Sequence, residues 1–265
     1  MKTRVVPTEF SSEGETIRGN FVLPNREGAF PGICKFHGLP GSSDQVGGIA
    51  TRLAETGFAV LTFDFRGFRS SEGRFSLTGE IKDAKEAVYH LIRSGYTTPE
   101  WIGVYGPSYG AAIAVLAAIE NPLITAVALR APVYDTLAFA KSPLVPAGID
   151  ELLRTAPDEM HGLTDPKWRQ GFIDQMIRDA ENLNPMNEIH KLAPRPLLII
   201  TGDTDQGISL EGVKRLFDVA NEPKEMVVVP GADHNLSNPA TFEMTMETIS
   251  AWFLRQFIEG DYLGI

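Results

Sequence analysis

The pentapeptide Gly106-Pro107-Ser108-Tyr109-Gly110 carries the strongest chemical signal in this 265-residue chain. The apolar run Trp101–Tyr105 leads directly into it, and a segment rich in small residues, Gly110–Ile119, follows. In this strand–turn–helix context, G-x-S-x-G is typical of a nucleophile elbow, a sharp turn that presents a serine hydroxyl above the edge of a sheet. The pattern therefore favours Ser108 as a nucleophile over the alternative that it only caps a helix.

A serine hydroxyl is a poor nucleophile at neutral pH and needs a neighbouring base. The chain contains five histidines, at positions 37, 90, 161, 190 and 234. Only His234 both follows the last apolar run of the chain and stands after the serine and an acidic loop, which is the order expected of this elbow. We predict His234 as the general base. The alternative is an exposed loop histidine.

The imidazole in turn needs a carboxylate that fixes its tautomer. The apolar run Leu197–Thr201 ends in Gly202-Asp203-Thr204-Asp205. Asp203 is close to the end of the run and suits a turn or a cap, whereas Asp205 lies further out and can reach the next loop. We predict Asp205 as the third member of the triad, with Asp203 and then Asp135 as alternatives.

An oxyanion hole requires two N–H donors aimed at the developing negative charge. The backbone N–H of Tyr109, the residue after the nucleophile, is one predicted donor. The other is expected from the glycine-rich stretch His37-Gly38-Leu39-Pro40-Gly41, where we choose the Leu39 N–H and keep Gly38 in reserve. The alternative is that this stretch is a purely structural turn.

The charged stretch from Asp64 to Gly73 follows another apolar run. We interpret it as structural, with Asp64 and Arg66 bonding loop backbone near the site. Substrate binding by Arg66 or Arg69 is the alternative. The single cysteine, Cys34, lies in an apolar stretch and is expected to be a small buried side chain.

Six short apolar runs predict parallel strands that are covered on both faces. They are Ile33–His37, Phe58–Phe65, Trp101–Tyr105, Ile124–Leu129, Leu197–Thr201 and Met226–Val229. Alternating residues at 4–10 and 16–23 predict an N-terminal hairpin, and amphipathic helical patterns fall between the later runs. We therefore expect an α/β fold with a mostly parallel, doubly wound sheet of about eight strands and helices on both faces.

Residues 132–194 interrupt the alternation of strands and helices. These 63 residues separate two predicted buried strands, far more than a usual connecting loop. Helical patterns occur around 148–155 and 167–182. We expect a helical lid insertion over the carboxyl ends of the strands, on a core of residues 1–131 and 195–265; the alternative is a helical pair packed on the side. Its apolar residues, which suggest a short-to-medium acyl chain or an aromatic acid as the bound group, are Leu144, Val145, Ile149, Met160 and Trp168.

Composition narrows the classes of partner. The chain has 34 acidic and 24 basic residues, a net charge of −10, which disfavours binding to nucleic acids and to anionic membranes. It lacks a signal-peptide pattern and any apolar run long enough to span a bilayer. We expect a soluble cytoplasmic protein.

Together these motifs resemble the α/β-hydrolase superfamily, in which the stretches around residues 37–41, 64–67, 106–110, 202–205 and 233–234 stand in the same order. Within it the chain is similar to small carboxylesterases and feruloyl esterases, which carry a lid in the interval 132–194. The run from Arg66 to Gly73 is also similar to the X-prolyl dipeptidyl peptidase and cocaine-esterase group. The family pattern Gly-x-x-Asp selects Asp205 over Asp203.

We therefore expect a carboxylic ester hydrolase that forms an acyl-enzyme on Ser108 and acts on a small-molecule ester without a metal or organic cofactor. The alternatives are a peptidase, thioesterase or lactonase with the same triad, or a non-catalytic ligand-binding protein of the same fold. A peptidase needs acids that grip a substrate ammonium, for which the insert offers Asp150, Glu151, Asp158 and Glu159. A homodimer is left open.

Overall fold

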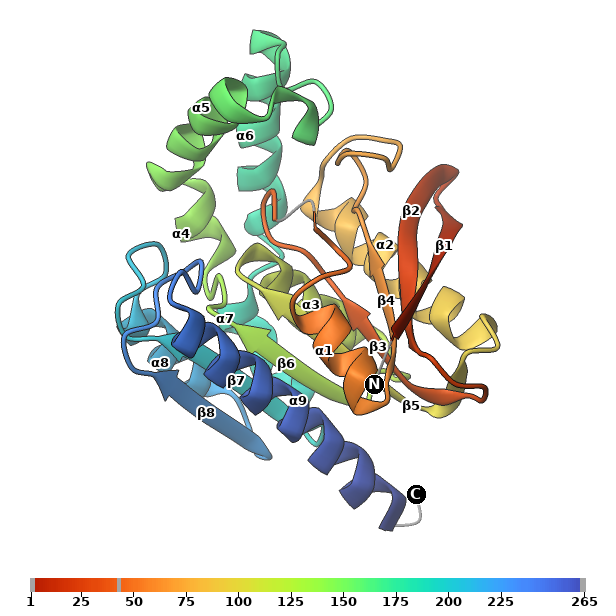
Figure 1. Ribbon diagram of the computed structural model, residues 1–265. Helices are drawn as coiled ribbons and strands as arrows, with labels where there is room; N and C mark the ends of the chain where they lie inside the picture. The colour runs from red at the N-terminus through yellow and green to blue at the C-terminus, as the bar shows by residue number, and fades with distance from the viewer. Residues whose placement is uncertain (1–2, 42–43, 263–265) are drawn as a thin grey trace.

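The computed structural model describes residues 3–41 and 44–262, so the outermost residues of the expected core lie outside the described part. Its centre is one eight-stranded sheet in the order β1-β2-β4-β3-β5-β6-β7-β8 (Figure 1). The strands are β1 (Thr3–Ser12), β2 (Glu15–Pro24), β3 (Phe30–Lys35), β4 (Ala59–Phe63), β5 (Thr97–Pro107), β6 (Ala126–Arg130), β7 (Leu197–Gly202) and β8 (Lys224–Val229). The β1–β2 hairpin pairs antiparallel with β4, and the remaining pairs are parallel. The expected α/β architecture is confirmed.

Helices cover both faces of the sheet because successive side chains of a strand point to opposite sides. In β3, for example, Ile33 packs in the cluster under α1 and α9, and its neighbour Cys34 packs in the cluster on the other face. Cys34 is fully buried, as predicted. The helices outside the insert are α1 (Ile49–Thr56), α2 (Leu77–Arg93), α3 (Tyr109–Glu120), α8 (Leu210–Val219) and α9 (Pro239–Tyr262). None of the described helices is both long and apolar enough to cross a bilayer.

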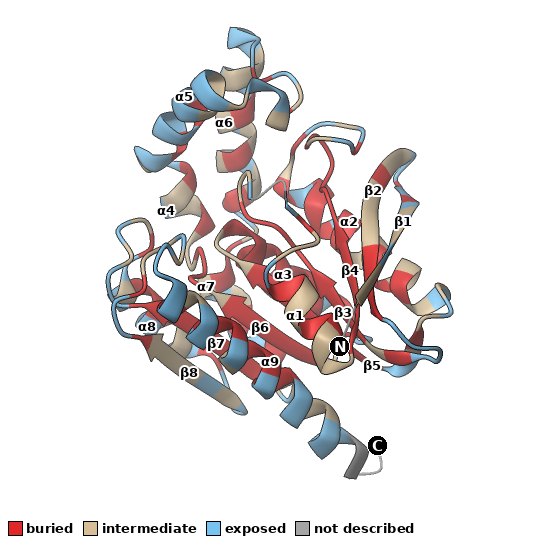
Figure 2. Ribbon diagram, viewed as in Figure 1, coloured by how far each residue is buried: buried red, intermediate tan, exposed pale blue. Residues whose placement is uncertain are grey.

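Residues 132–194 are helical, as the sequence predicts. They form α4 (Thr136–Ala140), α5 (Leu144–Thr155), the short 3-10 helix Pro157–Glu159, α6 (Pro166–Ala180), α7 (Pro185–Glu188) and the 3-10 helix Ile189–Leu192. Helices α5 and α6 stand away from the sheet, and α5 is largely exposed (Figures 1 and 2). The last part of the insert packs against α3. That the insert is a lid and a separate unit stays a prediction.

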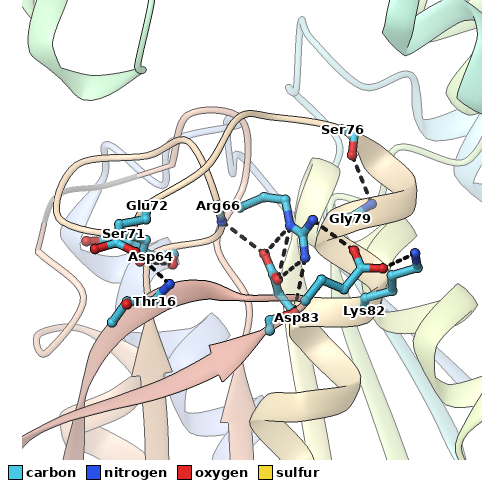
Figure 3. A network of polar contacts seen from close by, with 11 residues as sticks. Thr16, Asp64, Arg66, Ser71, Glu72, Ser76, Gly79, Lys82 and Asp83 are labelled. Atoms are coloured by element: carbon cyan, nitrogen blue, oxygen red, sulfur yellow. Dashed lines mark hydrogen bonds and ion pairs between the residues drawn. The ribbon is translucent and has the colours of Figure 1, made fainter.

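A buried charge network joins the charged stretch after β4 to helix α2 and the hairpin (Figure 3). The Arg66 guanidinium donates to both carboxylate oxygens of Asp83, at 2.7 and 3.1 Å, and to Glu13 and Ser12 at 3.1 Å. Asp64 accepts from the side chains of Arg69 and Ser70. The stretch is therefore structural as predicted, but the expected backbone partners were wrong, because buried charges are stabilised most by opposite charges.

Replacing Arg66 by Met is expected to destabilise the protein by about 3–5 kcal/mol, because it leaves the fully buried carboxylate of Asp83 without its cation. Chemical denaturation measures this loss. The matched control is Lys82→Met, which removes a half-exposed ion pair to Glu13 and should cost about 1 kcal/mol or less. Equal small effects of the two substitutions would show that the buried network does not stabilise the fold.

Candidate active site

Ser108 occupies a strained turn between β5 and α3. Its backbone has φ 53° and ψ −120°, a conformation that residues with a side chain rarely adopt. Two hydrogen bonds tie it to the chain at and after β6: the Ser108 N–H donates to the Arg130 carbonyl at 2.8 Å, and the Ser108 carbonyl accepts from the Val133 N–H at 3.0 Å. The neighbouring strand β6 and the chain that follows it therefore fix the position of the serine.

The two glycines of the pentapeptide are required by close packing. A Cβ at Gly106 would lie 2.2 Å from the carbonyl oxygen of Gly110, and a Cβ at Gly110 would lie 2.4 Å from the carbonyl oxygen of His37. Both distances are far inside van der Waals contact. Strand β5, helix α3 and the exit of β3 can approach one another only with hydrogen at these positions.

Three side chains from three loops meet at the carboxyl edge of the sheet. The Nε2 atom of His234 lies 3.1 Å from Ser108 Oγ, and its Nδ1 atom lies 2.7 Å from Asp205 Oδ2. Because an ionised carboxylate only accepts hydrogen bonds, Nδ1 carries the proton and Nε2 is left to accept from the serine hydroxyl. The structure thus brings together the three residues that the sequence singles out.

The Asp205 side chain is only 1% exposed. Burial opposes its ionisation, but the hydrogen bond from His234 and those from the backbone N–H groups of Ile208 and Gly207 outweigh burial and lower the pKa of the carboxyl group. Both N–H groups lie 2.8 Å from Oδ1. Asp205 therefore remains a carboxylate, with one oxygen held by the loop and the other directed at His234.

The other two candidate acids have different partners. The Asp203 carboxylate accepts from the Gly231 N–H at 2.6 Å, which is the turn role foreseen for it. Asp135 is the N-cap of α4 and accepts from the N–H groups of Leu137 and Ala138. Neither carboxylate is bonded to His234.

His37 is also near the site but is not placed to act as a base. Its Nε2 accepts from the Phe65 N–H at 2.9 Å, so its Nδ1 carries the proton and donates to the Gly38 carbonyl at 2.7 Å. Burial, with help from the nearby Arg69 cation, lowers the pKa of His37 to about 3. The neutral ring therefore fixes the start of the glycine-rich loop, residues 37–41.

Loop 37–41 lies directly beside the nucleophile. A Cβ placed on Gly38 would be 3.4 Å from the Cβ of Ser108. Tyr109 is the first residue of α3, where an N–H group has no acceptor within the helix. The choice of Leu39 and Tyr109 as oxyanion donors stays a prediction.

Arg69 links loop 37–41 to the insert. Its Nη1 donates to the Pro40 carbonyl at 3.3 Å and to Glu159 at 2.6 Å, and its Nε donates to Asp64 at 2.7 Å. Its backbone carbonyl accepts from His161. No local pattern announces this role, since it depends on segments 29 and 90 residues away.

A cavity of about 650 Å³ opens beside Ser108 and His234. Loop 37–41, helices α1 and α9 and the ends of strands β3, β5 and β6 line it. A smaller, mostly apolar hollow of about 50 Å³ shares Leu39 and Pro40 with this cavity. Four of the five apolar insert residues named above line that hollow, whereas Trp168 faces a separate depression.

Among the described residues, no group of three or more His, Cys, Asp or Glu could hold a metal ion.

The chain is similar in sequence and in fold to several known proteins. A model of the prolyl oligopeptidase family matches residues 46–259. An uncharacterized protein of Mycobacterium tuberculosis is 28% identical over 228 residues, which cover 85% of this chain and 70% of the relative. The esterase domain of a Rhodothermus marinus protein is 25% identical with a TM-score of 0.67, covering 95% of this chain and 98% of that domain. Est1E from Butyrivibrio proteoclasticus, solved with ferulic acid bound, is 21% identical with a TM-score of 0.71, covering 95% and 99%. The expected α/β-hydrolase fold is confirmed.

Proposed function

The chain belongs to the prolyl oligopeptidase family of hydrolases, and from this premise we propose that it is a serine esterase that cleaves carboxylic esters through an acyl-enzyme on Ser108. The observation that carries the proposal is the contact of His234 with both Ser108 Oγ and the Asp205 carboxylate. All three residues lie inside the segment that matches the family. A nucleophile, a base and an orienting acid within hydrogen-bonding reach are what acyl transfer requires.

In the acylation step, His234 Nε2 takes the proton of Ser108 as Oγ forms a bond to the ester carbonyl carbon. The N–H groups of Leu39 and Tyr109 hold the oxygen on which negative charge develops. The carbon–oxygen bond to the alcohol then breaks, and the alcohol leaves with the proton from His234. Asp205 stays ionised and stabilises the imidazolium.

In the deacylation step, a water molecule takes the place of the alcohol. His234 removes a proton from the water as its oxygen attacks the acyl carbon, and the same proton returns to Ser108 Oγ when the acid leaves. The reaction needs only groups of this chain and water.

An ester fits the site better than a peptide with a free ammonium group. The four acids of the insert that could grip such a group are absent from the lining of the cavity at Ser108. Glu151 pairs with Arg154, and Glu159 pairs with Arg69. The proposed acid part is an acyl chain of short to medium length or an aromatic acid; the apolar hollow beside Leu39, about 50 Å³, offers apolar contacts for a short chain but does not by itself hold an aromatic ring.

We also propose that residues 132–194 act as a lid over this site. Met160 forms a β-bridge with Phe68, and Glu159 contacts the arginine that holds loop 37–41. A movement of the insert would therefore shift loop 37–41 and change the position of the predicted oxyanion donor Leu39. The lining of the small hollow by α5 residues and by Leu39 supports the same role.

The test is turnover of 4-nitrophenyl esters from acetate to decanoate, of methyl ferulate, and of aminoacyl 4-nitroanilides by the full chain. We expect ester hydrolysis that falls off with long acyl chains, nitroanilide hydrolysis that is slower by orders of magnitude, and covalent labelling by a fluorophosphonate. Preferential nitroanilide cleavage would favour a peptidase. The absence of both turnover and labelling would favour a non-catalytic ligand-binding protein.

A further inference from the structure

Lys35 is a buried cation that the proposed reaction does not use. It is the last residue of β3, is 8% exposed, and lines the cavity at Ser108. In the sheet register it stands beside Tyr105, three residues before the nucleophile. Strand geometry therefore places its backbone roughly 10 Å from Ser108 along the sheet.

The ammonium group of Lys35 has only neutral oxygens as direct partners. It donates to the backbone carbonyl and to the side-chain Oε1 of Gln45, at 3.1 and 3.0 Å. No carboxylate among the described residues lies within ion-pair distance of it. Burial lowers its pKa to about 8, while the more distant charge of Asp44 acts in the opposite direction. At neutral pH the group is mostly a cation, and one of its three donors has no described partner.

A second cation lines the same cavity. Arg130, the last residue of β6, donates from Nη1 to the backbone carbonyl of His234 at 2.7 Å. Asp44 is the one carboxylate among the described residues that line the cavity, and its Oδ1 accepts from the Gly47 N–H. The wall therefore has two positive charges and one negative charge, on a chain whose net charge is −10.

On the basis of the proposed esterase function, we propose that the substrate carries a carboxylate that enters this cavity and is bound by Lys35. A buried ammonium with neutral partners gains most from an anion, because the interaction is strong where water is excluded. The positive charge of Arg130 also attracts the carboxylate, while its guanidinium keeps its hydrogen bond to the His234 carbonyl. The substrate class is an ester with a carboxylate several bonds from the scissile carbonyl, either in the acid part or in the alcohol part.

Two pairs of matched esters separate these two positions of the charge. The acid part is tested with monomethyl glutarate against its neutral amide, methyl 5-amino-5-oxopentanoate. The alcohol part is tested with the butyrate ester of 4-hydroxybenzoate against the butyrate ester of 4-hydroxybenzamide. Hydrolysis is followed by chromatography of the products, and the preference is the ratio of kcat/KM for the charged ester to that for the neutral one.

In one of the two pairs, Lys35→Gln is expected to lower this preference by about 10- to 100-fold, the size of one hydrogen bond to a charged group. Dividing the wild-type preference by that of the variant cancels the intrinsic reactivity of the esters. Lys214→Gln removes an exposed positive charge and is the control, for which the preference should stay within twofold of wild type.

A second test uses only the wild-type protein, so its result does not depend on whether the Lys35→Gln variant folds. Free glutarate should inhibit hydrolysis of 4-nitrophenyl butyrate competitively, and at a concentration at least 10-fold lower than the neutral diamide glutaramide. If neutral esters are hydrolysed but neither pair responds to Lys35→Gln and glutarate inhibits no better than the diamide, this inference is wrong and the proposed esterase function stands. If no ester of any kind is hydrolysed, the proposed function fails first.

Discussion

Replacing Ser108 by Ala is expected to lower kcat/KM for 4-nitrophenyl butyrate by about 10⁴- to 10⁶-fold. The variant removes the oxygen that forms the acyl bond and leaves only the oxyanion donors and the binding contacts. Alanine keeps a Cβ, so the backbone at φ 53° is neither relieved nor further strained. We therefore expect the loss of activity without a change in the melting temperature of more than a few degrees.

The matched control for this substitution is Ser237→Ala, which removes an exposed hydroxyl close to His234 in the chain. Its kcat/KM should stay within a factor of two of the wild type. A mass spectrum of the wild-type protein after fluorophosphonate treatment should place the adduct on the peptide that contains Ser108. Undiminished ester turnover by a folded Ser108→Ala protein would remove this residue from the mechanism.

Replacing Asp205 by Asn is expected to lower kcat by about 10⁴-fold, with KM changed far less. Asn has nearly the same shape, but its neutral amide no longer stabilises the imidazolium, and its NH₂ group favours the wrong tautomer of His234. The buried site offers little water to replace the lost charge, since the Asp205 side chain is 1% exposed. Steady-state kinetics on one good ester measure the effect.

Asp203→Asn is the decisive comparison, because the two aspartates are two residues apart in the same loop. Asn at position 203 can still accept from the Gly231 N–H, so its kcat should change by no more than about threefold. If Asp203→Asn proved the more damaging of the two, the orienting carboxylate would have been assigned to the wrong residue.

The sequence predicts the elbow well because the constraints at Ser108 are local. A buried strand, a turn and a helix follow one another without interruption, and Gly106 is needed because a Cβ there would meet the Gly110 carbonyl in the same unit. Gly110 is the exception, because its close contact is with His37 at the exit of β3. His234 is predictable for a related reason. Carboxyl ends of parallel strands share one edge of the sheet, so a loop that follows β8 must lie near a loop that follows β5.

The strands and helices also appear in the sequence as patterns, but their ends are less well predicted. Strand β5 begins at Thr97, four residues before the apolar run, and pairs there with Phe30 and Pro31 across a register shift. Thr97 and Thr98 of that extension belong to the strand because they pair with β3. Hydropathy within a single segment does not contain that information.

Only the tertiary structure decided which charges surround the site. Arg66 pairs with Asp83 and Arg69 pairs with Glu159, both on other elements, so these pairings depend on how distant segments pack. In the sequence, Lys35 is one polar residue in an apolar run. In the structure, strand alternation and the position of α1 place its side chain in the lining of the cavity at Ser108. The sequence by itself singled out the candidate reacting groups, because their placement follows from short-range steric rules and from the order of the strands. The tertiary structure determined the surroundings of those groups, because the burial and the charge around the candidate site result from contacts between segments far apart in the chain.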